Sequence, residues 1–93
     1  MIYKLVYSKT SRDQIRNLHP EIKAVIKSRL QKLKDNPFTG KSLERELSGY
    51  RSLRAKRFRV IYCIREKDKM VEIHHVGRRT DIYELFKDSL TQD

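Results

Sequence analysis

The sequence contains a single cysteine, Cys63, so an internal disulfide bond is excluded. It also lacks a secretory signal peptide, and the two absences together predict a reducing, cytoplasmic location. No stretch is apolar enough to cross a membrane. Besides Cys63, the histidines that could hold a metal are His19, His74 and His75, and these residues do not pair at a spacing typical of zinc sites. We therefore expect neither a metal nor a cofactor.

Acidic residues are scarce relative to basic ones. The 93 residues include 12 Asp and Glu against 22 Lys and Arg, which gives a net charge of +10. Such an excess destabilises a compact chain by self-repulsion and favours a polyanionic partner. Nucleic acid is the first choice, an acidic protein or a membrane surface are alternatives, and a generally basic, well-solvated surface is the simplest explanation. The charge is clustered rather than spread, which favours RNA over that simplest explanation.

The densest basic cluster lies in the segment RSLRAKRFRVIY, residues 51–62. Its cations, which have no acid among them, are Arg51, Arg54, Lys56, Arg57 and Arg59. A second basic pair, Arg78 and Arg79, follows one predicted strand later. We expect the two clusters to face each other across a small sheet and to hold a polyanion, most simply RNA.

The length predicts one domain spanning residues 1–93. Its elements follow the order β-α-α-β-β-β, with a short helix at the end. Strands are predicted from β-branched and aromatic runs, and helices from three- and four-residue apolar spacing between capping residues and prolines. The predicted strands cover residues 2–7, 50–55, 58–65 and 70–76, and the predicted helices cover residues 8–18, 20–35 and 79–90.

This order predicts an α+β fold in which a helix hairpin packs on one face of a small, mainly antiparallel sheet. An antiparallel sheet can leave its other face open to a ligand. Alternation along the strand of residues 58–65 places Phe58, Val60 and Tyr62 toward the helices and Arg59 on the open face. The same alternation places His74 and His75 on opposite faces.

Three local patterns suggest a family. Asn36-Pro37 follows the second helix, LSGYRSLR leads into FRVIY, and VGRRTDIY stands near the end. In this order, and over nearly the whole chain, they resemble the RelE/ParE superfamily of bacterial and archaeal toxins. The glycine usual in the turn before the FRVIY-like strand is absent, and Lys56-Arg57 occupies that turn.

The resemblance implies the toxin of a type II toxin–antitoxin pair. RelE-type toxins cleave messenger RNA in the ribosomal A site, whereas ParE-type toxins poison DNA gyrase and are not nucleases. Partners would be a cognate antitoxin and, in the RelE branch, the ribosome with its messenger. The free toxin would be a monomer and the antitoxin complex a hetero-oligomer. A non-catalytic RNA-binding module is the third possibility.

For the RelE branch, the resemblance places Arg59, Arg79 and Tyr83 in the active site. The reaction would be attack of a ribose 2′-hydroxyl on the adjacent phosphate, which needs a base, charge stabilisation and an acid. Two arginines could stabilise the charge of the phosphorane, because a guanidinium can bind two phosphoryl oxygens at once. Tyr83, four residues after Arg79 on a predicted helix, could protonate the leaving 5′-oxygen. Lys56, among other cations that favour a neutral amine, and His75 are the alternative bases. The predicted RNA-binding residues are Arg51, Arg54, Arg57 and Arg78.

Overall fold

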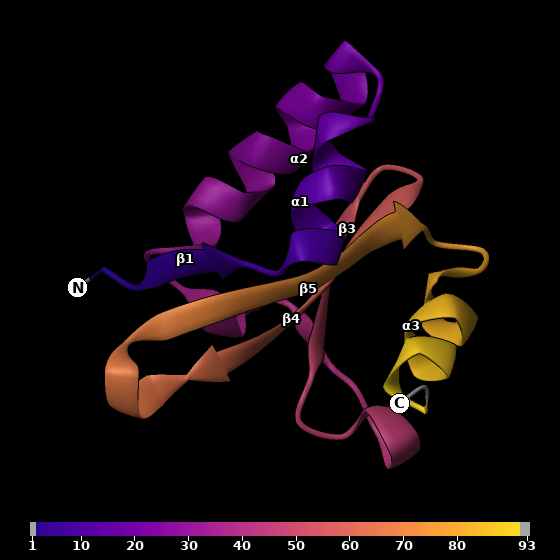
Figure 1. Ribbon diagram of the computed structural model, residues 1–93. Coiled ribbons are helices and arrows are strands. Elements are labelled where there is room, and N and C mark those ends of the chain that lie inside the picture. The colour runs from indigo at the N-terminus through magenta and orange to yellow at the C-terminus, as the bar shows by residue number, and fades with distance from the viewer. Residues whose placement is uncertain (1, 92–93) are drawn as a thin grey trace.

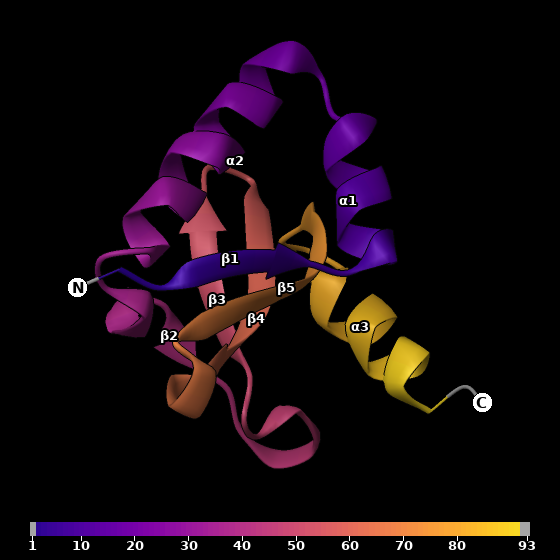
Figure 2. The same cartoon turned by 60° about the vertical axis from the view of Figure 1, so that its left-hand side comes forward.

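The computed structural model describes residues 2–91, which form a mixed sheet with helices on both faces (Figures 1 and 2). Its strand order is β1-β5-β4-β3-β2. The strands described are β1 (Lys4–Tyr7), β2 (Lys41–Ser42), β3 (Arg51–Ala55), β4 (Phe58–Arg65) and β5 (Met70–Arg78). The helices described are α1 (Lys9–Arg16), α2 (Pro20–Leu33) and α3 (Ile82–Leu90), with short 3₁₀ turns at Pro37–Thr39, Arg45–Leu47 and Glu66–Asp68. The predicted α+β class is confirmed.

The two helices of the hairpin begin within a residue of the positions that the sequence predicts. The Ser8 hydroxyl accepts the amide of Ser11 at the start of α1, and Pro20 occupies the first turn of α2, where its missing amide leaves no bond unmade. The buried side of α2 consists of Ile26, Leu30 and Leu33. Within residues 2–91, no helix is long and apolar enough to span a membrane.

The centre of the sheet is the antiparallel meander β3-β4-β5, as expected from its short connections. Both edges depart from a simple antiparallel arrangement. Strand β1 pairs in parallel with β5, with Lys4 opposite Met70. The helices α1 and α2 carry the chain from β1 at one edge of the sheet to β2 at the other edge. The two-residue strand β2, which none of the predicted strands includes, pairs with β3 at the other edge.

Two apolar cores lie on opposite faces of the sheet. The larger one joins α1 and α2 to the sheet face that carries Val60 and Tyr62, as predicted. The smaller one packs Ile82 and Phe86 of α3 over Ile61 of β4. The expectation of an open second face is therefore wrong for the middle of that face, because the apolar side of α3 covers Ile61 there.

A β-bulge in β5 corrects the placement of the two histidines. Ile61 pairs with His75, whereas the next residue, Tyr62, pairs with Ile73, so that His74 is the extra residue. The extra residue interrupts the alternation of side chains. Both imidazole rings consequently lie near the ring of Phe86, with centroids 6.0 Å away for His74 and 5.7 Å for His75. The two histidines thus share the face covered by α3 and do not lie on opposite faces.

Candidate functional site

A buried serine joins two of the predicted active-site residues. Ser52 of β3 is 1% exposed, and its hydroxyl oxygen accepts a hydrogen bond of 3.1 Å from Nη1 of Arg59 on β4. The same oxygen accepts one of 3.0 Å from the hydroxyl of Tyr83 on α3. Three elements therefore meet at one oxygen atom, and the Arg59 guanidinium and the Tyr83 phenol are held side by side.

The register of the sheet explains why these side chains meet. Ser52 lies opposite Ile61, and Arg54 lies opposite Arg59, so these residues project from the face on which α3 packs. Helix α3 covers Ile61 and stops short of Arg54, which is exposed, while Arg59 is half-buried. Like charges directly opposite on neighbouring strands destabilise a sheet. The pair of arginines is therefore suited to an anion that lies across both.

Arg79 lies at the end of the sheet next to this pair. Its amide donates a hydrogen bond of 2.8 Å to the carbonyl of Arg57, which ties the segment after β5 to the turn between β3 and β4. Its side chain is exposed. The prediction that Arg79 and Tyr83 share one face of a helix is wrong, because α3 begins only at Ile82. Arg79 precedes that helix in a turn, so its approach to the site depends on the turn and not on helical spacing.

Lys56 occupies the first position of the turn between β3 and β4 and is exposed. Its φ is 58°, a left-handed conformation that costs a residue with a side chain about 1–2 kcal/mol. Glycine is the residue that adopts this conformation without cost. The departure from the usual glycine that the sequence analysis noted is therefore a strained lysine at the tip of the hairpin.

The predicted RNA-binding residues divide between the two faces of the sheet. Arg51 lies opposite Tyr62 on the α2 face, where it donates to the carbonyls of Gly40 at 3.2 Å and Phe38 at 3.1 Å. Its guanidinium also lies 5.5 Å from the centre of the Phe38 ring. These contacts give Arg51 a structural role in holding the segment after α2.

Arg78 is the second predicted RNA-binding residue on the side of the helix hairpin. It lies opposite Phe58, with its guanidinium 5.9 Å from the centre of that ring. Arg57 is exposed in the hairpin turn. With Asn17 and His19, these residues line a groove between the tip of the helix hairpin and the turn. Of the four predicted RNA-binding residues, Arg54 lies opposite Arg59 in the sheet.

His75 is buried, with 8% of its surface exposed. Its Nε2 lies 3.0 Å from Nε2 of Gln14, and the side-chain oxygen of that glutamine accepts the amide of Val76. Burial lowers the pKa of His75 below its ordinary value, so the neutral ring prevails at neutral pH. Buried in this way, the imidazole ties β5 to α1, and its position does not favour the predicted role as a base acting on RNA.

Ser52 is the residue at this junction that the sequence analysis missed. A serine within a run of arginines carries no distinctive signal of its own. Pairing the two predicted strands residue by residue would have placed Ser52 opposite Ile61, and therefore diagonal to Arg59 on the same face. What could not be derived that way is the contact with Tyr83, which depends on how α3 packs.

Comparison with known proteins agrees with this architecture. Residues 5–83 match the family model described as ParE toxin of type II toxin-antitoxin system, parDE. Toxin RelG of Mycobacterium tuberculosis is 35% identical over 85 residues, which cover 89% of this chain and 98% of the relative.

Two solved structures show the same fold. The toxin–antitoxin complex RelBE2 from Mycobacterium tuberculosis contains a chain that is 31% identical, with a TM-score of 0.79 over 87% of this chain and 95% of that one. A mutant of E. coli toxin RelE in the free state gives a TM-score of 0.78 at 18% identity, over 97% of this chain and 96% of that one. The sequence matches and the fold place the chain among small toxins of the RelE/ParE kind. The chain belongs to the ParE toxin family of type II toxin–antitoxin systems.

Proposed function

We propose that this toxin is a ribosome-dependent endoribonuclease of the RelE type, which stops translation by cutting messenger RNA. The observation that carries the proposal is the buried Ser52 hydroxyl, which holds Arg59 and Tyr83 together beside the exposed Arg54. A guanidinium and a phenol fixed at one point of a basic face can act on the same phosphate. A purely protein-binding surface has no need of that arrangement.

The roles follow from the chemistry of attack by a 2′-hydroxyl on the neighbouring phosphate. Charge builds up on the phosphoryl oxygens in the transition state, and preorganised cations at those oxygens lower the barrier. Arg59 and Arg54 supply them from the sheet, and Arg79 supplies a third from the turn after β5. The phenol of Tyr83 protonates the leaving 5′-oxygen or stacks on a nucleobase of the messenger.

Lys56 is the base in this proposal. It is exposed at the hairpin tip, on the turn that Arg79 contacts through its backbone. The ribosome would supply much of the remaining acceleration by holding the messenger for in-line attack, since positioning alone can contribute several kcal/mol. Arg51 and Arg78, which lie toward the helix hairpin, are left out of the RNA-binding surface in this scheme.

The partners in this proposal are the ribosome with its messenger in the cytoplasm and an antitoxin that keeps the toxin inactive. The 31% identical structure described above is a toxin–antitoxin complex. An antitoxin segment rich in acidic residues would suit the Arg54 and Arg59 face, because it would occupy the place of the phosphates. The free toxin would be a monomer.

The test is to add the purified toxin to a translating extract and to map new 5′ ends on the messenger. Arg59→Ala should lower cleavage about 100–1000-fold, the usual loss when one charge-stabilising donor is removed. Arg16→Ala is the matched control, because it removes one exposed arginine of α1 that is paired with Asp13 of the same helix. Intact messages with continuing protein synthesis would refute the proposal, as would equal loss of cleavage in both variants.

Inhibition of DNA gyrase is the second candidate, and the family model that matches the chain favours it, since that model describes ParE toxins. The resemblance implies that such a toxin acts by protein binding, without chemistry of its own. A supercoiling assay with purified gyrase separates the two functions. Inhibition of supercoiling by both the wild type and Arg59→Ala, with no messenger cleavage, would establish this alternative.

A further inference from the structure

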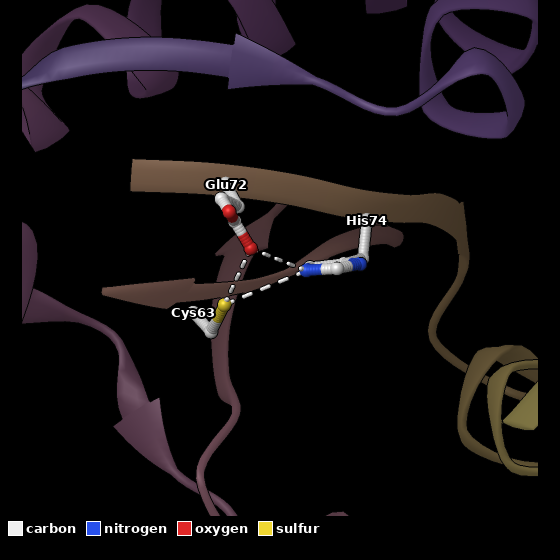
Figure 3. Close-up of side chains that lie close together, drawn as sticks. All are labelled: Cys63, Glu72 and His74. Carbon is white, nitrogen blue, oxygen red and sulfur yellow. Dashed lines mark hydrogen bonds and ion pairs between the residues drawn. The ribbon is translucent and has the colours of Figure 1, made fainter. Parts of the chain in front are cut away.

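Three side chains with metal-binding atoms converge at one point of the sheet (Figure 3). They lie on the face that carries α3, because Cys63 is two residues from Ile61 along β4. Cys63 of β4 lies directly opposite Glu72 of β5 in the antiparallel register, and His74 follows two residues after Glu72. The register therefore brings a thiol, a carboxylate and an imidazole to one point. The spacing of these residues along the sequence does not predict this group, because its members come from two strands.

The three donor atoms form a nearly equilateral triangle. Cys63 Sγ lies 3.3 Å from Glu72 Oε1 and 3.4 Å from His74 Nε2, and Nε2 lies 3.4 Å from Oε1. Around a tetrahedral zinc ion, typical bond lengths place sulfur about 3.6 Å from nitrogen and from oxygen, and nitrogen about 3.4 Å from oxygen. The triangle is thus close to one face of a zinc tetrahedron, and shifts of about 0.3 Å or less would complete the fit.

The surroundings hold two of these side chains in orientation. Arg65 Nε binds the other carboxylate oxygen of Glu72, Oε2, at 3.2 Å, which leaves Oε1 directed at the cysteine and the histidine. The His74 ring meets Tyr50 edge-on, with 5.3 Å between the ring centres. A polar partner of a ligand, such as Arg65 beside Glu72, orients that ligand in a metal site.

The cluster is accessible to an ion from solvent. The side chains of Glu72 and His74 are 25% and 29% exposed, and Cys63 is half-buried. A shallow groove of about 260 Å³ that is lined by Tyr50, Cys63 and Arg65 opens beside the thiol. An ion held by three protein atoms would therefore keep its fourth position open to water.

We propose that Cys63, Glu72 and His74 bind a zinc ion, with water as the fourth ligand. A thiolate, an imidazole and a carboxylate in tetrahedral arrangement suit Zn²⁺, whereas Mg²⁺ and Ca²⁺ require oxygen ligands. The site would crosslink β4 and β5 next to the ring of Phe86 and so stiffen the part of the sheet on which α3 packs. The proposal is independent of whether the toxin cleaves RNA, because its tests measure only metal binding.

The first test needs no variant. The protein is freed of metal with a chelator and titrated with Co²⁺, which replaces zinc and absorbs visibly in tetrahedral sites. A thiolate-to-cobalt charge-transfer band that saturates at one Co²⁺ per chain and is bleached by Zn²⁺ is the expected result. Since Cys63 is the only cysteine in the sequence, that band assigns the ligand without ambiguity. Saturation without the band, or no saturable binding, would overturn the proposal and leave the cluster a hydrogen-bonded network.

The second test compares two carboxylate variants by isothermal titration with Zn²⁺. Loss of a residue that supports a metal ligand typically lowers metal affinity about 10–100-fold. Glu72→Gln removes a proposed ligand itself and should lower the affinity for Zn²⁺ by more than that. Glu66→Gln is the matched control, because it removes an exposed carboxylate in the turn that connects the same two strands. Equal affinity in the two variants would also overturn the proposal.

Discussion

The hydroxyl of Tyr83 donates a 3.0 Å hydrogen bond to the hydroxyl oxygen of Ser52, and this bond connects the C-terminal helix with the most basic strand. Helix α3 otherwise holds to the sheet through Ile82 and Phe86, which are apolar and do not fix the direction of a phenol. The bond gives Tyr83 that direction. Because Arg59 donates to the same oxygen, the position of each side chain depends on the serine.

Replacing Ser52 by alanine should impair cleavage while the protein stays folded. A hydrogen bond from a charged donor contributes about 1.5–3 kcal/mol, and loss of about 1.4 kcal/mol in the transition state slows a reaction tenfold. We expect cleavage in a translating extract to fall at least about tenfold. Ser42→Ala, at an exposed position of β2, is the control. Unchanged cleavage by Ser52→Ala would show that the junction is only structural.

Lys56→Gly should make the protein more stable and less active. Relief of the left-handed strain gains about 1–2 kcal/mol, and the greater freedom of glycine in the unfolded chain takes back about 0.5–1 kcal/mol. Urea unfolding should therefore show a small gain in the free energy of unfolding, while the loss of the amine should slow cleavage by about 100-fold or more.

Lys69→Gly is the matched control for that variant. Lys69 has a φ of 53° in the turn between β4 and β5, away from the Ser52 junction. Its replacement also removes the contact of the Lys69 ammonium with the Tyr3 ring, 5.2 Å from its centre, so the gain in stability should be smaller, with full activity. If Lys56→Gly cleaves as fast as Lys69→Gly, the proposed base is wrong.

His75 should make the protein lose stability in mild acid. Burial lowers its pKa in the folded state, so the unfolded chain takes up a proton near pH 6.5 whereas the folded protein does so only at lower pH. This contribution to stability is therefore complete above about pH 6.5 and declines as the pH falls toward the folded pKa. Urea unfolding at about pH 7 and pH 5.5 should show the decline in the wild type and a smaller one in His75→Asn. An equal decline in both proteins would assign the effect to other groups.

The alternation of side chains in β4 could be predicted because strand periodicity is rigid. Val60 and Tyr62 on one side and Arg59 on the other follow from a period of two, and the structure has them so. The same rule failed in β5, because the extra residue His74 reverses which side chains lie on which face beyond it. The residue types in β5 do not indicate that a bulge occurs there.

The covering of the second face was also beyond the sequence pattern. Ile82 and Phe86 are spaced as one side of a helix, but nothing local says which surface that side meets. Its seat on Ile61 is a long-range contact, and the meeting of Tyr83 with Ser52 depends on it. The residues of the candidate site could thus be proposed singly, whereas their junction required the tertiary structure.

Tyr62 and Gly40 form a contact whose energetics can be separated by a double-mutant cycle. The buried hydroxyl of Tyr62 donates to the carbonyl of Pro37 at 2.6 Å and accepts the amide of Gly40 at 3.0 Å. Tyr62→Phe leaves both backbone groups without that partner and should lower the free energy of unfolding by about 1–3 kcal/mol. Gly40→Ala should also destabilise, since its Cβ would overlap the Tyr62 hydroxyl, although its φ of −73° suits alanine.

In the Tyr62→Phe background, Gly40→Ala should cost less, because the oxygen that it would overlap is gone. A coupling free energy of about 1 kcal/mol from urea unfolding of the four proteins is the expected outcome. Gly49→Ala is the control, since Gly49 has a φ of 96° and open space where the added methyl group would lie, so that its cost arises from the backbone alone. That cost should be the same in both backgrounds. Additive effects for Gly40→Ala and Tyr62→Phe would mean that the segment after α2 moves away from the strand instead of resisting the added methyl group.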